Sequence, residues 1–295
     1  MNAKPVVTDG ISVDVEDYFQ VEAFADRITP EMWPRFASRV AENTRRVLSL
    51  FSEHNVRATF FVLGYVAEFY PQVVRDIVSA GHEVGCHSFL HRRIMQLTKD
   101  EFRRDTRRAI AAIENAGGTK VSGYRAPTFS ITRESLWALS ILAEEGFTYD
   151  SSVFPVRHDF YGMPEMPRFI YRWQLPGGRE LFEIPPTTIR LIGQNFAAAG
   201  GGYLRLLPMW YTRWALNRVH SRDRQPASIY FHPWEIDPAQ PRLPGKLKSR
   251  IRHYWKLRQM EDRIRELLQA RRFVPLCEIL GKRLSEGDMV SQTVT

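Results

Sequence analysis

The segment Ile11-Ser-Val-Asp-Val-Glu-Asp17 decides the fold of this chain of 295 residues. Its apolar residues alternate with polar ones, which is the period of a β-strand. The segment ends in three acidic residues within four positions, Asp14, Glu16 and Asp17. A strand that carries carboxylates at its C-terminal end is typical of β/α folds, in which functional side chains gather at that end of a parallel sheet.

Strands and helices alternate in the sequence that follows. Residues 38–54 have the apolar spacing of a helix, and Ala58-Thr-Phe-Phe-Val-Leu-Gly64 is a buried-strand run closed by glycine. We expect further helices at 72–80, 98–115, 132–145, 208–219 and 260–271, and further strands at 83–87, 122–126, near 149, at 181–184, 227–232 and 273–276. This alternation favours a parallel sheet, and we predict an α/β fold in the form of an irregular (β/α) barrel.

The chain shows no domain linker and no internal repeat. We therefore expect one barrel over residues 1–280, with a C-terminal extension from about residue 190, followed by a flexible polar tail at 281–295. No run of 18 or more apolar residues occurs, and the first ten residues lack the apolar stretch of a secretory signal. We expect a cytoplasmic protein without a transmembrane segment.

The composition narrows the classes of function. Apolar residues make up 44% of the chain and charged residues 25%, which is typical of a folded globular protein. The only cysteines are Cys86 and Cys277, so neither a disulfide framework nor a cysteine zinc site is expected. The net charge is +8, and eleven Lys and Arg residues lie between 242 and 272. A solvated basic helix is the favoured interpretation of this region, and contact with the inner membrane face or an anionic polymer is the alternative; no nucleic-acid-binding motif is present.

Two histidines follow the strand expected at 83–87. In His87-Ser-Phe-Leu-His91 the imidazoles are four residues apart, and on a helical turn they would face the same side and could hold one metal ion. A carboxylate from the end of the first strand would complete a site with open positions for water and substrate. The alternatives are that the acids only cap the next segment, or that the set belongs to a non-haem iron oxygenase.

Two further strand ends carry polar residues, in Gly123-Tyr-Arg125-Ala-Pro127 and Tyr230-Phe-His232-Pro-Trp234-Glu235. Arg125 could hold a base carboxylate in its charged form, and His232 could protonate a leaving amine. With the metal site and a second carboxylate, these residues supply the groups needed for metal-assisted hydrolysis of an amide or ester.

Taken in order, these motifs resemble the polysaccharide deacetylase family, also called NodB-homology or carbohydrate esterase 4. The resemblance covers about residues 11–149 and the strand around His232. It is greatest to the subgroup found with bacterial exopolysaccharide and exosortase systems, in which the Asp-Val-Glu-Asp-Tyr-Phe segment and a C-terminal extension with Gly200-Gly-Gly-Tyr203 recur.

The resemblance assigns roles to individual residues. It implies that Asp14 is the general base and that Arg125 orients it. His87 and His91 are implied as metal ligands, and His232 as the general acid. The backbone N–H of Thr128 is implied as the oxyanion contact. For the third metal ligand we favour Asp17, because it has the family's usual residue type; Glu16, which occupies the family's Asp-x-Asp place, is the alternative. Asp150 is the nearest match to the family's fourth motif.

The resemblance also implies a cofactor and a substrate. The cofactor is a divalent metal, Zn²⁺ first, with Co²⁺, Ni²⁺ or Fe²⁺ as alternatives. The substrate is an N-acetylated glycan, either a bacterial exopolysaccharide or its lipid-linked precursor, with Tyr203, Trp234 and Pro127 as candidate substrate contacts. The alternatives are hydrolysis of another C–N amide bond, in a cyclic imide or ureide, and a catalytically dead carbohydrate-binding assembly factor.

Overall fold

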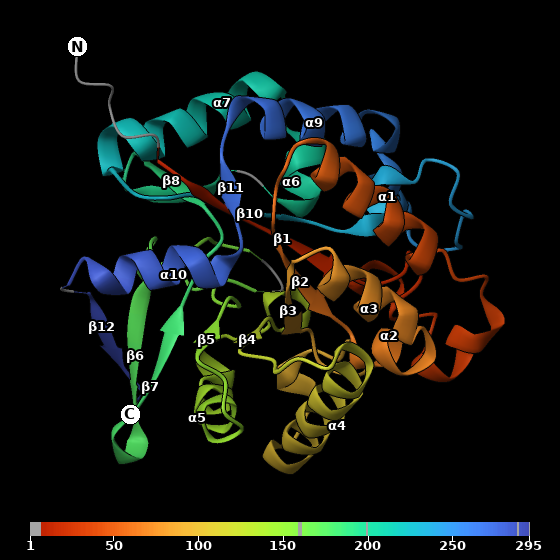
Figure 1. Ribbon diagram of the computed structural model, residues 1–295, viewed down its shortest axis with the longest axis horizontal. Coiled ribbons are helices and arrows are strands. Elements are labelled where there is room, and N and C mark those ends of the chain that lie inside the picture. The colour runs from red at the N-terminus through yellow and green to blue at the C-terminus, as the bar shows by residue number, and fades with distance from the viewer. Residues whose placement is uncertain (1–6, 159–160, 199, 288, 295) are drawn as a thin grey trace.

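One sheet forms the centre of the computed structural model, which describes residues 7–158, 161–198, 200–287 and 289–294 (Figure 1). Its strand order is β10-β1-β2-β3-β4-β5-β7-β6-β12, with β11 added to β1, and all neighbours are parallel except β6 and β7. The strands are β1 Asp9–Val15, β2 Thr59–Val62, β3 Glu83–Cys86, β4 Gly123–Tyr124, β5 Tyr149–Asp150, β6 Tyr171–Leu175, β7 Arg179–Glu183, β10 Ser228–Phe231, β11 Phe273–Val274 and β12 Ser291–Thr293. The predicted α/β class is confirmed.

The segment after β7 connects one side of the sheet to β10, the strand at the other end of the strand order. The Ile184 N–H donates to the carbonyl of Asp150, which keeps this segment beside β5. Three residues on, the Thr187 N–H donates to the carbonyl of Ser228 in β10, and the Ser228 N–H donates to Thr187 Oγ1. Segments from β7 and β10 therefore meet by hydrogen bonds, and the wall is that of an irregular barrel.

The helices that follow the first strands cover the outside of this wall. These are α1 Val40–Glu53, α2 Gly64–Phe69, α3 Pro71–Ser79, α4 Lys99–Gly117 and α5 Trp137–Glu144 (Figure 1). The apolar stripe of α1, which includes Val40, Val47 and Leu50, is buried, as the helical spacing predicts. Strand β1 is buried along its whole length because one face lies under helices and the other fills the barrel.

The C-terminal half contributes to the same barrel. Strand β10 pairs with β1, and α10 Leu276–Ser285 lies across the N-terminal ends of the strands. There the Leu276 N–H donates to Thr59 Oγ1, and a Cβ on Gly10 would lie 2.6 Å from the Leu276 side chain. The end that α10 covers is opposite the C-terminal strand ends, which stay available for a site.

Several elements had no clear sequence signal. They are the hairpin of β8 Thr188–Leu191 and β9 Gln194–Ala197, the strand β6, and the helices α2, α6 Gly201–Leu206 and α8 Leu247–Tyr254. In contrast, α7 Met209–Arg218 and α9 Met260–Ala270 lie where helices were expected. Residues 281–285 end α10, and β12 pairs with β6, so the described part of 281–295 is not simply a flexible tail. The polar side chains of β12 gave no strand signal, and the strand forms because its backbone hydrogen-bonds to β6. Within the described residues, no helix is long and apolar enough to cross a membrane.

Gly85 in β3 gives a test of how tightly the barrel is packed. A Cβ there would lie 2.5 Å from the Phe61 ring, so we expect Gly85→Ala to lower the free energy of unfolding by about 1–3 kcal/mol in urea titrations. Gly281 in α10 has nothing within 4 Å of its Cβ position, so Gly281→Ala should leave stability unchanged or raise it by about 0.5–1 kcal/mol. Equal midpoints for the two variants would contradict this packing.

Candidate active site

The C-terminal ends of four strands meet at one end of the barrel. Val15 of β1 is in register with Val62, Val62 with Cys86 of β3, and Cys86 with Tyr124 of β4, while β10 lies on the other side of β1. The residues that directly follow β1, β3, β4 and β10 are Glu16, His87, Arg125 and His232, respectively. Parallel pairing therefore brings together the polar residues that the sequence predicts for the site.

Three buried side chains form a group that could hold a metal ion. One donor atom from each of Glu16, His87 and His91 lies within 4.8 Å of the others. His87 Nδ1 is 2.8 Å from the carbonyl oxygen of Arg125, and because a carbonyl can only accept, this nitrogen carries the hydrogen and Nε2 keeps its lone pair. Burial lowers the pKa of His87 to about 4, so the imidazole is neutral at pH 7, as a ligand must be.

The environment of Glu16 fits a shared cation. His91 Nε2 is 2.8 Å from Glu16 Oε2, yet this buried oxygen accepts no hydrogen bond within the part of the chain that the structure describes. Burial raises the pKa of Glu16, but His91 and the other imidazoles outweigh it and bring the pKa to about 2. A charged carboxylate and two imidazoles are a donor set suited to Zn²⁺ and similar divalent ions.

The loop that carries the two histidines is not the helical turn that their spacing indicates. It bends, with Ser88 and His91 in the left-handed region at φ 64° and 52°. The Phe89 N–H donates to the buried Asp105, and the His91 N–H donates to Ser88 Oγ, so local hydrogen bonds hold the bend. The histidines converge because the backbone turns sharply.

Asp17 lies apart from this group and caps a helix. Its Oδ2 accepts hydrogen bonds from Ser38 Oγ at 2.6 Å and from the backbone N–H groups of Arg39 and Val40 at the start of α1. Side chains alternate between the two faces of a strand, so Asp14 and Glu16, two residues apart, share a side that Asp17 does not. Of the two candidates for the third ligand, the structure places Glu16 with the histidines.

Arg125 holds the predicted general base. Its Nη1 donates to Asp14 Oδ1 at 2.7 Å and to Ser12 Oγ, and its Nη2 donates to Ser151 Oγ. The guanidinium lies over the ring of Phe61, 4.3 Å from its centroid. This pairing fixes the orientation of the Asp14 carboxylate, while Asp14 Oδ2 lies 3.9 Å from His232 Nε2.

His232 has a partner that the sequence reading did not assign. Its Nδ1 is 3.0 Å from Glu235 Oε2, and its Nε2 is 3.6 Å from Glu16 Oε1. Burial lowers the pKa of His232, but Glu235 outweighs it and raises the pKa to about 9. Arg205 donates to the other oxygen of Glu235, and despite burial this contact helps to hold the pKa of Glu235 at about 2. The pair presents a protonated imidazole to the site.

Asp150 holds the loop after Arg125 through a hydrogen bond with Ser152. The Ala126 N–H donates to Ser152 Oγ at 2.7 Å, and Ser152 Oγ donates to Asp150 Oδ1. Pro127 is buried, and Thr128 is half-buried with φ 56°, a strained conformation for a β-branched residue. Burial raises the pKa of Asp150 to about 6. Asp150 therefore acts on the loop that carries Thr128, whereas Glu235 is the carboxylate that contacts His232.

The aromatic residues predicted to contact the sugar, Trp234 and Tyr203, are not fully exposed to solvent. Trp234 is buried between His232 and His253, with ring centroids 5.2 and 4.2 Å away, and its Nε1 donates to Glu16 Oε1. Tyr203 is half-buried, with its hydroxyl 3.4 Å from that of Tyr161.

The Gly200-Gly-Gly run permits a close approach behind β10. A Cβ on Gly200, which has φ 108°, would lie 2.4 Å from the ring of Tyr230. These glycines therefore pack against the strand that leads to His232.

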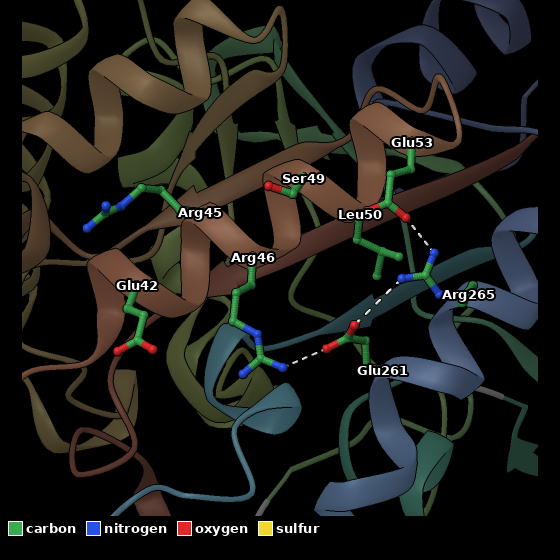
Figure 2. A pocket seen from close by; sticks show the side chains of 8 residues that line it. All are labelled: Glu42, Arg45, Arg46, Ser49, Leu50, Glu53, Glu261 and Arg265. Atoms are coloured by element: carbon green, nitrogen blue, oxygen red, sulfur yellow. Dashed lines mark hydrogen bonds and ion pairs between the residues drawn. The ribbon is translucent and has the colours of Figure 1, made fainter.

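The pocket in Figure 2 is separate from this site. It has a volume of about 340 Å³ and lies between α1 and α9. Two ion pairs join its walls, Arg46 with Glu261 and Arg265 with Glu53 (Figure 2). None of its lining residues belongs to the metal-ligand group.

Two family models match different parts of the chain. Residues 31–149 match the family model "Polysaccharide deacetylase", and residues 151–281 match "Domain of unknown function (DUF3473)". His87, His91 and Arg125 lie in the first match, His232 and Glu235 lie in the second, and Asp14 and Glu16 precede both.

Curated relatives are similar over part of the chain. The peptidoglycan-N-acetylglucosamine deacetylase of Bacillus cereus is 33% identical over 98 residues, 33% of this chain and 36% of that protein. A chitooligosaccharide deacetylase of Sinorhizobium fredii is 38% identical over 73 residues, 25% of this chain and 34% of that protein. The matches span about a third of the length of these relatives. A solved structure from Mycobacterium smegmatis, assigned to the polysaccharide deacetylases, has the same fold, with a TM-score of 0.65 at 22% identity over 100% of this chain and 96% of that one.

Metal binding separates the two candidate carboxylates. We expect Glu16→Gln and His87→Ala to weaken zinc binding by more than about tenfold in calorimetric titrations, because each removes a ligand. Asp17→Asn should keep zinc affinity and instead lose about 1–2 kcal/mol of stability, because it weakens the cap of α1. Loss of zinc in Asp17→Asn with normal binding in Glu16→Gln would reverse the assignment.

Proposed function

We propose that this chain, of which residues 31–149 match the polysaccharide deacetylase model, is a metal-dependent hydrolase of the carbohydrate esterase 4 type that removes acetyl groups from N-acetylated sugar residues. The observation that carries the proposal is one cluster in which the group Glu16, His87 and His91 lies beside a carboxylate held by arginine and an imidazole held by glutamate. Amide hydrolysis needs an electrophile, a base and an acid, and this cluster offers candidates for all three.

Glu16, His87 and His91 would hold the divalent ion, with Zn²⁺ as the first candidate and Co²⁺, Ni²⁺ or Fe²⁺ as alternatives. When bound, such an ion supplies Lewis acidity towards the acetyl carbonyl and its attacking water. Trp234 donates to Glu16 Oε1, and the Arg125 carbonyl accepts from His87 Nδ1, so the ligands are oriented from behind.

Asp14 takes the proton of the attacking water in this proposal. Arg125 occupies its Oδ1, so Oδ2, on the side of His232, is the oxygen that can accept. Because Arg125 is also fixed by Ser12 and Ser151, the base keeps one orientation through the reaction.

His232 gives a proton to the departing sugar nitrogen. With Nδ1–H bound to Glu235, the Nε2–H is the donor that faces the site. The backbone N–H of Thr128, at the rim formed by the loop after Arg125, is the proposed donor to the oxyanion. Loss of acetate then requires no covalent attachment to the chain.

The glycan we propose is a bacterial exopolysaccharide or its lipid-linked precursor, met at the inner membrane face. The relatives are named for peptidoglycan and chitooligosaccharide, both polymers with N-acetylated sugars, which supports this class of substrate. The half-buried Tyr203 is the proposed sugar contact, whereas the buried Pro127 and Trp234 would act mainly as walls of the site. Hydrolysis of a cyclic imide or ureide remains the alternative reaction, and a dead carbohydrate-binding factor the alternative role.

Acetate release tests the reaction. Purified protein should release acetate from an N-acetylglucosamine oligomer, lose this activity on chelation and regain it with zinc. Asp14→Asn should lower the rate by about 10²-fold or more because it removes the base, while Asp76→Asn on the outer helix α3 is the matched control. Metal-loaded protein that releases no acetate would shift the proposal to O-acetylated or imide substrates, and a chain that binds no metal would favour the dead-site alternative.

The Glu235 carboxylate gives a separate test of the acid. Glu235→Gln keeps the shape but removes the charge next to His232 Nδ1, so we expect kcat to fall about 10- to 100-fold with zinc affinity unchanged. Glu278→Gln, at an exposed pair with Arg57, is the control. A fully active Glu235→Gln enzyme, shown to be folded at the assay temperature, would show that His232 does not need the Glu235 charge for this role.

A further inference from the structure

The helix α8 and the residues around it carry an unusual charge pattern. Residues 241–260 contain seven Lys and Arg residues and no Asp or Glu, the basic positions being Arg242, Lys246, Lys248, Arg250, Arg252, Lys256 and Arg258. Among the residues that the structure describes, the ion pairs of this segment are limited to Lys246 with Asp26. Most of this charge therefore faces solvent uncompensated.

An apolar stripe runs along the same helix. Leu247 and Ile251 are four residues apart and lie on one face of α8, and Trp255 is the C-cap that follows the helix; the three side chains are 71%, 50% and 52% exposed. Lys248, Arg250 and Arg252 are exposed on either side of this stripe. Large apolar side chains in a row are costly in water and point to a partner surface.

The opposite face of α8 is anchored in the protein. His253 is buried, with its ring stacked on Trp234 at 4.2 Å and edge-on to Phe24 at 5.0 Å. Arg205 donates to the carbonyls of Arg252, His253 and Trp255 at the C-terminal end of the helix. The helix is thus fixed, and the exposure of its stripe is a property of the fold.

The surface beside the stripe has the same character. Leu206, at the end of α6, is 37% exposed, and its carbonyl accepts from Lys256 Nζ. Tryptophan and lysine are the residues enriched where proteins meet the headgroup region of a bilayer.

We propose that α8 docks this protein on the surface of a membrane that contains anionic phospholipid. A fixed helix with an apolar stripe between rows of Lys and Arg matches an interfacial helix, in which the stripe enters the acyl boundary and the cations meet lipid phosphates. A soluble polyanion would engage the cations but leave Leu247 and Ile251 in water. A second copy of the chain would set seven cations against seven and is disfavoured by repulsion.

Docking through α8 would bring the bilayer near the proposed site. His253 packs on Trp234, and Trp234 packs on His232, so one layer of side chains separates the helix from the imidazole of the site. A glycan attached to lipid would then need to reach only a short way from the membrane. The docking proposal itself does not depend on the activity, because vesicle binding needs no substrate.

Vesicle co-sedimentation of the full chain tests this surface. We expect binding to phosphatidylcholine vesicles that contain about a third phosphatidylglycerol to be more than tenfold tighter than to phosphatidylcholine alone, and to weaken with salt. The triple change Leu247→Ser, Ile251→Ser, Trp255→Ser and the double change Arg250→Glu, Arg252→Glu should each weaken binding by more than about tenfold.

Matched controls use sites away from α8. Ile192→Ser, at a fully exposed isoleucine of the β8–β9 turn, and Lys120→Glu should keep full binding. All variants should retain the circular dichroism of the parent and its acetate release from a soluble oligomer. Equal binding to neutral and anionic vesicles, or normal binding by either α8 variant, would overturn the proposal. Binding to heparin but not to vesicles would assign the surface to a polyanion, and self-association abolished by the triple change would assign it to a second copy.

Discussion

The buried guanidinium of Arg125 is the constraint on which the site and the barrel both depend. Removing such a cation from water costs several kcal/mol unless hydrogen bonds and an opposite charge offset it. Here the partners come from β1, through Ser12 and Asp14, and from Ser151 just after β5. These strands lie on different sides of β4, so the arginine is satisfied only when the wall has the correct strand order. The same bonds that stabilise the centre of the barrel therefore set the position of the proposed base.

A second buried arginine–carboxylate pair, Arg205 with Glu235, also positions a residue of the site. Arg205 and Glu235 are both buried, and Glu235 also contacts His232. Each pair is close to neutral as a unit, which leaves Glu16 as the carboxylate near the histidines without an arginine of its own. A carboxylate left in this state among imidazole nitrogens is a favourable place for a divalent cation. Because arginines already compensate Asp14 and Glu235, Glu16 is the carboxylate that remains to attract a cation.

The sequence predicted the elements and residues that depend on local pattern. Strand alternation and the register of parallel strands were enough to bring Asp14, His87, Arg125 and His232 to one end of the sheet. Strand alternation also places Glu16 on the same side as Asp14, two residues earlier, and Asp17 on the other side. Residue type alone had favoured Asp17. The bend after His87 was hidden because it depends on Ser88 and Asp105, and the Arg205–Glu235 pair was hidden because its members are 30 residues apart and meet only through tertiary structure. The strand β12 was missed because pairing, not side-chain pattern, stabilises it.

The C-terminal half of the chain is as necessary to the site as the part that carries the histidine motif. The proposed acid, its glutamate and the arginine behind them all come after residue 200, and they reach the site because β10 pairs with β1. The same half supplies α8, whose buried His253 packs on Trp234 while Arg205 binds both Glu235 and the end of the helix. Arg205 therefore links the outer surface of α8 to the imidazole of the site. A barrel without this half would keep the two histidines proposed as metal ligands and the proposed base, but it would lack the proposed proton donor and the fixed helix at its surface.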